Sequence, residues 1–129
     1  MSKLASIEAA KSYMQRDPRS YLWDAREAAA AIMEFVAGKT FEDYASDRLL
    51  RSAVERQFEI IGEALSQLCK IEPQWAERIP DTPQIIAFRN VLIHGYASVN
   101  DLTVWRTIDE SLPTLCETVT RLLDEAGAP

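Results

Sequence analysis

The sequence predicts an all-α protein, an antiparallel bundle of four to five helices. Glycine is scarce, at 4 of 129 residues, and the chain is rich in alanine, leucine, glutamate and arginine, which favour helices. Apolar residues recur at alternating steps of three and four, the spacing of a helix with one buried face. No segment shows the alternation and turn punctuation of a β-strand. Together these observations favour helix throughout.

Residues 17–126 are predicted to form one helical domain, preceded by an N-terminal extension over residues 1–16. The extension has a weak apolar spacing that is compatible with a helix. The first clear helix begins at Asp17, the expected N-cap, with Pro18 in the first turn, and it is expected to end at Gly38. Its apolar stripe consists of Leu22, Ala25, Ala29, Ile32 and Val36.

Thr40 is expected to begin the second element, because carboxylates in its first turn favour the positive end of a helix dipole. The helical pattern runs to about Ile71. A short separate helix around Tyr44, with a kink near Ser46, is compatible with the same stretch. The main stripe consists of Leu50, Val54, Phe58 (or Ile61), Leu65 and Leu68.

Prolines break the segment over residues 72–83, where Trp75 and Ile79 are expected to reach the core from a short helical turn. The next helix is predicted from Gln84 to about His94. Pro83 fits its first turn, and Thr82 or Asp81 is the expected cap. Gly95, which follows His94, is where this helix can end or distort.

The last helix has the most regular apolar stripe in the chain. Asn100 and Asp101 offer an N-cap. Pro113 falls inside the stripe and should kink the helix or split it at Ser111, because proline removes a backbone hydrogen bond. The stripe consists of Trp105, Ile108, Leu112, Leu115, Val119 and Leu122.

Composition limits the classes of function. Apolar residues make up 47% and charged residues 26%, which is ordinary for a globular protein. The net charge of −6 is unlike that of a non-specific nucleic-acid binder, which needs a high local density of cations. Any RNA site must therefore be a local basic patch, or be formed by two chains together.

The cysteines, Cys69 and Cys116, are far apart, and the chain has one histidine. These are too few ligands for a zinc site, so we expect buried free thiols, no metal and no cofactor. The sequence shows no signal peptide and no apolar run near 18 residues, which would mark a membrane span. The expected compartment is the cytoplasm.

Chemically active groups are concentrated in the stretch from Arg89 to Tyr96. A guanidinium, an amide (Asn90), the imidazole of His94 and a phenol lie within eight positions. The stretch is similar to the signature of HEPN domains: arginine, a polar residue that is often asparagine, three or more spacers, histidine, one residue, and often tyrosine. Residues 53–64 also resemble the middle helix of the HepT-like branch of HEPN proteins. So does Val104-Trp105 followed by Leu112-Pro113. The resemblance covers roughly residues 18–125.

This resemblance implies a homodimer that is the toxin of a toxin–antitoxin module and cleaves RNA without a metal. It assigns Arg89, Asn90 and His94 to a catalytic cleft between the two chains. It also implies a partner, a minimal nucleotidyltransferase antitoxin that silences the toxin by adding AMP to Tyr96. No membrane partner is expected.

The residue types fit that chemistry. Imidazole suits proton transfer because its pKa lies near ~6.5, and guanidinium binds phosphoryl oxygens in a bidentate manner. Asn90 and His94 are one helical turn apart on one face, whereas Arg89 and His94 are separated by about 140°. They can converge through the length of Arg89, a bend near Gly95, or a second chain. A dimer would also supply a second histidine, so that acid and base are both present.

Ordinary structural roles remain open for each of these residues. His94 can be a surface residue, and Arg89 can pair with a carboxylate such as Glu63. Asn90 can have the purely structural role of capping or bracing the helix, and Tyr96 can be a half-buried core residue. The three tryptophans are expected to be core anchors. Two other functions also stay open: a catalytically silent dimer that binds nucleotide or scaffolds a nucleotidyltransferase, and a dimerisation protein without a ligand.

Overall fold

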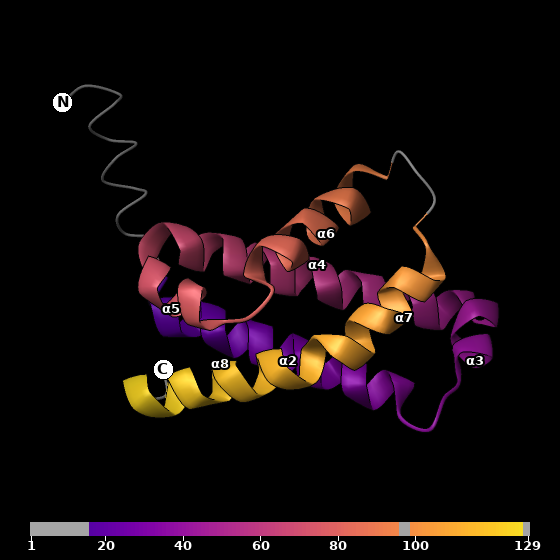
Figure 1. Cartoon of the computed structure of the whole chain (residues 1–129), viewed down its shortest axis with the longest axis horizontal. Coiled ribbons are helices and arrows are strands. Elements are labelled where there is room, and N and C mark those ends of the chain that lie inside the picture. The colour runs from indigo at the N-terminus through magenta and orange to yellow at the C-terminus, as the bar shows by residue number, and fades with distance from the viewer. Residues whose placement is uncertain (1–15, 96–98, 128–129) are drawn as a thin grey trace.

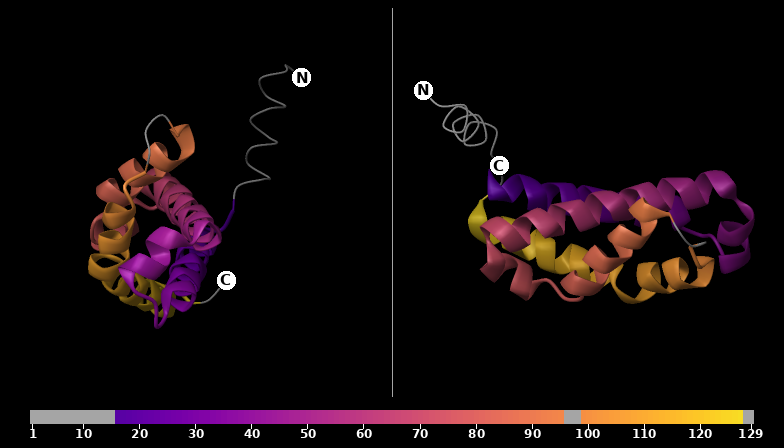
Figure 2. Two further views of the ribbon diagram at one scale, coloured as in Figure 1. Left: turned by 90° about the vertical axis from the view of Figure 1, so that its right-hand side faces the viewer. Right: turned by 90° about the horizontal axis from the view of Figure 1, so that it is seen from above.

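The computed structural model describes residues 16–95 and 99–127, which form seven α-helices and no strand (Figure 1). Four helices, α2 (Pro18–Val36), α4 (Arg48–Ile71), α6 (Thr82–His94) and α8 (Leu112–Ala126), make up the bundle. α2 packs between α4 and α8, and α6 packs on α4 at an oblique angle (Figure 2). The all-α prediction is confirmed. The predicted extension lies outside the described residues except for Arg16, and Tyr96 also lies outside them.

The first helix follows the predicted signals. The Asp17 carboxylate accepts a hydrogen bond from the Arg19 backbone N–H at 2.9 Å, and Pro18 lies in the first turn. After Val36 the chain turns through Gly38, whose φ of 73° lies in the left-handed region that glycine adopts without strain. The apolar stripe of α2 faces α4 and α8, so this helix forms the centre of the core.

The short helix around Tyr44 is a separate element, α3 (Phe41–Ser46). Thr40 and Asp43 form a reciprocal capping box, with hydrogen bonds of 3.1 and 2.9 Å. Asp47 interrupts the helical path and caps α4 by accepting a hydrogen bond from the Leu50 N–H at 3.1 Å. The predicted break near Ser46 therefore lies where α3 ends and Asp47 begins a new helix as its N-cap.

The core contains the predicted stripes except Val36 and Trp105, which are partly buried against it, and both Phe58 and Ile61 are fully buried. It also contains Tyr44, which the periodicity did not identify as a core residue. The Tyr44 ring packs against Trp105 with centroids 5.5 Å apart, and burial raises the pKa of its phenol. This aromatic contact attaches α3 to α7 (Asp101–Glu110).

The last stripe is split where Pro113 predicts it. Ser111 separates α7 from α8, and Pro113 lies in the first turn of α8, where its missing N–H costs no hydrogen bond. The Asn100 side chain caps α7 by accepting hydrogen bonds from Leu102 and Thr103 N–H groups at 2.9 and 3.1 Å. Before them, α5 (Pro73–Arg78) is the short turn that lets Trp75 pack on the core and Ile79 enter it.

Two predictions about burial are wrong. Trp23 is 42% exposed and lies under the Arg26 guanidinium at 4.3 Å, because it is one position outside the buried stripe of α2. Cys69 is exposed, one position after the buried Leu68, and Cys116 is half-buried; both thiols are free. In each case the residue type suggested the core, but the helical phase places the side chain outward.

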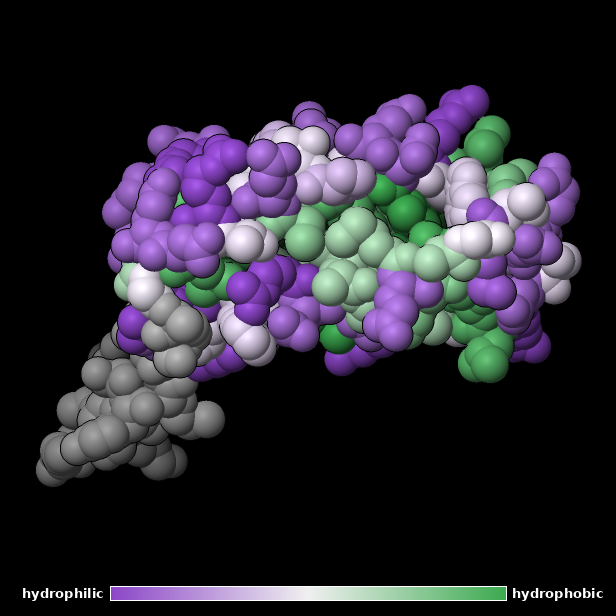
Figure 3. Space-filling view, turned by 90° about the horizontal axis from the view of Figure 1, so that it is seen from below, coloured by the Kyte–Doolittle hydropathy of each residue, from purple (hydrophilic) through white to green (hydrophobic). Residues whose placement is uncertain are grey.

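On the face turned away from α6, hydrophobic side chains lie along the middle of the molecule and hydrophilic ones surround them (Figure 3). Across residues 16–95 and 99–127, none of the helices combines the length and the apolar character that a membrane crossing requires.

Candidate functional site

The helix α6 carries the described candidate residues, and its first turn is fixed by its neighbours. It begins at Thr82, two residues before the predicted start, with Asp81 as the N-cap residue at a φ of 62°. Neither expected side chain caps it. The Thr82 hydroxyl instead donates to the Ile79 carbonyl oxygen at 2.9 Å, and the Asp81 carboxylate accepts from the Ser111 hydroxyl at 3.2 Å. These contacts join α6 to the end of α5 and to the junction of α7 and α8.

The helix ends directly after His94. Gly95 adopts a φ of 60°, and its N–H donates to the Val91 carbonyl oxygen at 3.1 Å. This glycine is required for its backbone conformation, since an added Cβ would meet no atom within 4 Å. α6 is continuous from Arg89 to His94, so no bend at Gly95 brings these two side chains together.

Arg89 is held by a chain of hydrogen bonds between α6 and α4. Its Nη2 donates to Glu63 Oε2 at 2.6 Å, and its Nη1 donates to Asn90 Oδ1 at 2.9 Å. The other Glu63 oxygen accepts from Gln67 Nε2 at 3.0 Å. The alternative in which Arg89 pairs with Glu63 is therefore confirmed. Two of the five guanidinium N–H groups are used in these bonds and the Nε–H is buried without a partner, so the two remaining Nη hydrogens are the donors left for a phosphate.

Gly62 allows the two helices to approach at this point. A Cβ on Gly62 would lie 2.3 Å from the Arg89 Cβ and 2.6 Å from its Cγ. Phe58, one turn before Gly62 on α4, packs edge to face on Phe88, which directly precedes Arg89 on α6, with ring centroids 5.2 Å apart. Glycine at this position therefore lets the stem of Arg89 lie directly on α4, which fixes where the guanidinium can reach.

Asn90 and His94 lie on the exposed side of α6, one turn apart. Val91 and Ile93 between them are 50% and 47% exposed, whereas Ile85 on the same helix is buried. α6 is thus apolar on the side that packs on the bundle and also near its exposed end. Arg89 points to α4, while Asn90 and His94 lie at the surface.

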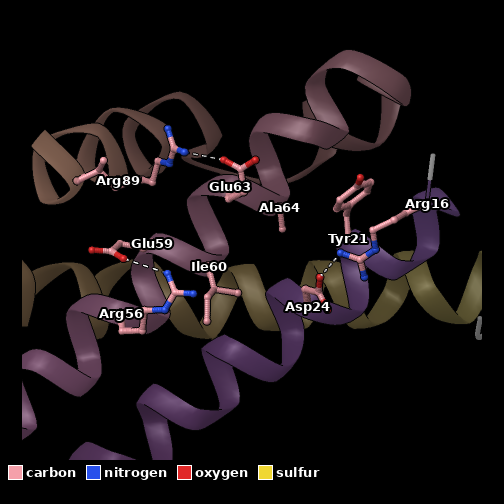
Figure 4. Close-up of a pocket in the computed structure, with 10 residues that line it drawn as sticks. Arg16, Tyr21, Asp24, Arg56, Glu59, Ile60, Glu63, Ala64 and Arg89 are labelled. Atoms are coloured by element: carbon pink, nitrogen blue, oxygen red, sulfur yellow. Dashed lines mark hydrogen bonds and ion pairs between the residues drawn. The ribbon is translucent and has the colours of Figure 1, made fainter. Parts of the chain in front are cut away.

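A groove of about 310 Å³ adjoins Arg89 (Figure 4). It is formed by the start of α2, the middle of α4 and the second half of α6, segments that are far apart in the sequence. An ion pair lies at the edge of the groove on each of these three segments. Its lining residues are Arg16, Tyr21, Asp24, Arg56, Glu59, Ile60, Glu63, Ala64, Arg89 and Ile93.

Sequence reasoning did not identify this groove, because two of its three ion pairs join residues that only the fold brings together. Arg16 bonds to Asp24 at 2.7 Å from before the first helix, and Glu63 meets Arg89 across 26 positions. The only advance signal was Glu63, noted as a partner for Arg89. Within the described part of the chain, no three Cys, His, Asp or Glu side chains are grouped to hold a metal ion.

Comparisons with known proteins agree on one family. The family model described as "Ribonuclease HepT-like" matches residues 25–122. A protein of Thermococcus cleftensis named "Probable ribonuclease HepT" is 36% identical over 79% of this chain and 92% of its own length. A "Putative RNase" of Caldanaerobacter subterraneus is 34% identical over 85% of this chain and 97% of its own, and one of Methanocaldococcus jannaschii is 30% identical over 78% and 92%. No solved structure matches significantly.

Proposed function

The chain belongs to the HepT-like ribonuclease family, and on that premise we propose that it is a metal-independent endoribonuclease, the toxin of a toxin–antitoxin module. The observation that carries the proposal is the arrangement on α6. One continuous helix places a braced guanidinium, a surface amide and a surface imidazole within six positions, Arg89 to His94. The names of the relatives support the same class of reaction.

In the proposed reaction the 2′-hydroxyl of RNA attacks the adjacent phosphorus and loses its proton to a base. The bond to the 5′-oxygen breaks, and an acid protonates that oxygen, which leaves a 2′,3′-cyclic phosphate. His94 transfers a proton, since imidazole is suited to that role near neutral pH. Arg89 stabilises the charge on the phosphoryl oxygens, and Asn90, which accepts from Arg89, orients the phosphate or the imidazole.

The ribonuclease is tested with the wild-type protein expressed without any partner. We expect growth arrest, and cleavage of total RNA by the purified protein in EDTA. Harmless expression with intact RNA would favour the other candidate, a catalytically silent dimer that binds nucleotide. The groove beside Arg89 keeps that candidate open, and a rise of the melting temperature with AMP would support it.

A homodimer is part of the proposal, because one chain supplies one histidine for two proton transfers. The exposed Val91 and Ile93 next to His94 support a partner surface on α6. We expect Val91→Glu to halve the molar mass measured by light scattering and to reduce RNA cleavage. Leu49→Glu, at a position 80% exposed on α4, is the matched control and should change neither quantity. A monomeric Val91→Glu protein with full activity would contradict the dimeric site.

The proposed partner is a minimal nucleotidyltransferase that adds AMP to Tyr96, two positions after His94. A bulky anion there would repel RNA by like charge. We expect Tyr96→Phe to stay toxic when the partner is co-expressed, whereas wild type and Tyr21→Phe are silenced. Mass spectrometry should find the added AMP on the peptide that contains Tyr96. Silencing of Tyr96→Phe with an unchanged mass would refute this mode of control.

A further inference from the structure

The groove beside Arg89 combines an apolar floor with charged sides. Ile60 and Ala64 of α4 form the floor, and three arginine–carboxylate pairs surround it (Figure 4). The pairs are Arg16 with Asp24 at 2.7 Å, Arg56 with Glu59 at 3.1 Å, and Arg89 with Glu63 at 2.6 Å. The Tyr21 ring stands at the α2 side, with the Arg16 guanidinium 4.8 Å from its centroid. The groove therefore offers stacking surface and cations together.

We propose that this groove binds one nucleotide of single-stranded RNA, next to the phosphate that Arg89 holds, with its base against Tyr21 and Ile60 and its phosphate on Arg56. The proposal rests on the ribonuclease function and names where the substrate chain continues. It adds residues of α2 and α4 to a site otherwise confined to the end of α6.

Size and continuity favour a single nucleotide. A volume of about 310 Å³ is at the small end of ligand pockets, which fits one base and its sugar rather than a longer segment. Arg89 and Ile93 line the same groove, and His94 directly follows Ile93. A chain whose scissile phosphate contacts Arg89 can therefore continue directly into this groove.

An arginine at the edge of the groove can release its carboxylate partner and bind a phosphate instead. Arg56 is 67% exposed, and its pair with Glu59 is an i, i+3 surface pair of the kind that contributes little to stability. A phosphodiester offers the guanidinium a bidentate partner in place of Glu59. Tyr21 is half-buried at the base of α2, so its ring is held in place for stacking. Base–aromatic stacking is tolerant of sequence, which suits an enzyme that must accept varied RNA.

The test measures binding of a fluorescent single-stranded oligoribonucleotide to the His94→Ala protein, in which cleavage does not interfere. Tyr21→Ala should weaken binding about 5- to 150-fold, the range for loss of base–aromatic stacking. Arg56→Ala should lower the slope of log Kd against log salt concentration by about 0.7, the value for one phosphate contact on a single strand.

Matched controls come from the same chain. Trp23→Ala removes an α2 aromatic that also carries an arginine over its ring but lies outside the groove. Arg121→Ala removes an exposed arginine paired with Glu117 on α8. Both should bind RNA as the His94→Ala parent does. In the active background, Tyr21→Ala should raise KM and leave kcat within a few-fold of wild type.

The two proposals fail separately. If wild type cleaves RNA but the groove variants show unchanged Kd, salt slope and KM, the nucleotide subsite is refuted and the ribonuclease stands. If wild type does not cleave RNA, the ribonuclease fails, while the binding measurement still decides the groove. Arg56 is too exposed for its replacement to disturb the fold, so its salt slope remains decisive even if Tyr21→Ala is unstable.

Discussion

Replacing His94 by alanine is expected to lower the rate of RNA cleavage by about 10²- to 10⁴-fold, the usual contribution of a general acid or base. His94 is exposed at the last position of α6, so the substitution removes no core packing and should leave the protein folded. Toxicity on expression should disappear with the activity. The measurement is the initial rate of cleavage of a defined oligoribonucleotide in EDTA, together with growth.

Arg106→Ala is the control for this loss. Arg106 is an exposed cation on α7 with no assigned role, so its removal should leave cleavage near the wild-type rate. A mixture of His94→Ala and Arg89→Ala chains tests whether the two residues act together across the dimer. If each cleft uses His94 of one chain and Arg89 of the other, mixed dimers regain part of the activity. Full activity of His94→Ala alone would return His94 to the ordinary role of a surface residue.

Much of the fold could be predicted because local patterns and tertiary packing agree. The stripe of α2 and the Pro113 split of the last helix depend on spacing and on one missing N–H, which the chain shows directly. The errors arise where residue type and helical phase disagree. Trp23 and Cys69 have side chains typical of the core, but each lies one position beyond it. Helical phase should therefore be given more weight than residue type.

Only those features of the candidate site that lie within one helix could be predicted from the sequence. Periodicity places Asn90 and His94 on one face, and the structure confirms that the helix between them is continuous. What Arg89 contacts depends on α4, so the chain alone left Glu63 as one possibility among several. The groove that joins Arg16 and Tyr21 to Arg89 had no local signal, since it exists only where α2, α4 and α6 meet.

Gly62→Ala is expected to reduce both stability and activity. In a helix interior, alanine is favoured over glycine by about 1 kcal/mol. Here its Cβ would lie 2.3 Å from the Arg89 Cβ, so α4 and α6 must move apart. Overpacking of this kind costs about 1–3 kcal/mol in the free energy of unfolding, which outweighs the gain from helix propensity. A shift of Arg89 by about 1 Å should lower kcat roughly 10²-fold.

Urea denaturation and cleavage rates measure the two effects, and Gly38→Ala separates them. Gly38 has a φ of 73° and no atom within 4 Å of an added Cβ, so alanine there introduces backbone strain of about 1–2 kcal/mol without crowding. That variant should lose stability and keep its activity when assayed well below its melting temperature. A Gly62→Ala protein that is more stable than wild type and fully active would refute the close approach at Arg89.

A double-mutant cycle identifies Arg89 as the crowded partner. Arg89→Gly removes the Cβ and Cγ that an alanine at position 62 would meet, so Gly62→Ala should cost less stability in that background than in wild type. Arg89→Ala keeps the Cβ at the 2.3 Å contact and should relieve much less. A coupling energy above about 0.5 kcal/mol with glycine, and a smaller one with alanine, would locate the contact at the Arg89 stem. The glycine on α4 would then be a requirement for where the Arg89 guanidinium lies, and a coupling near zero in both backgrounds would mean that α6 is positioned by other contacts.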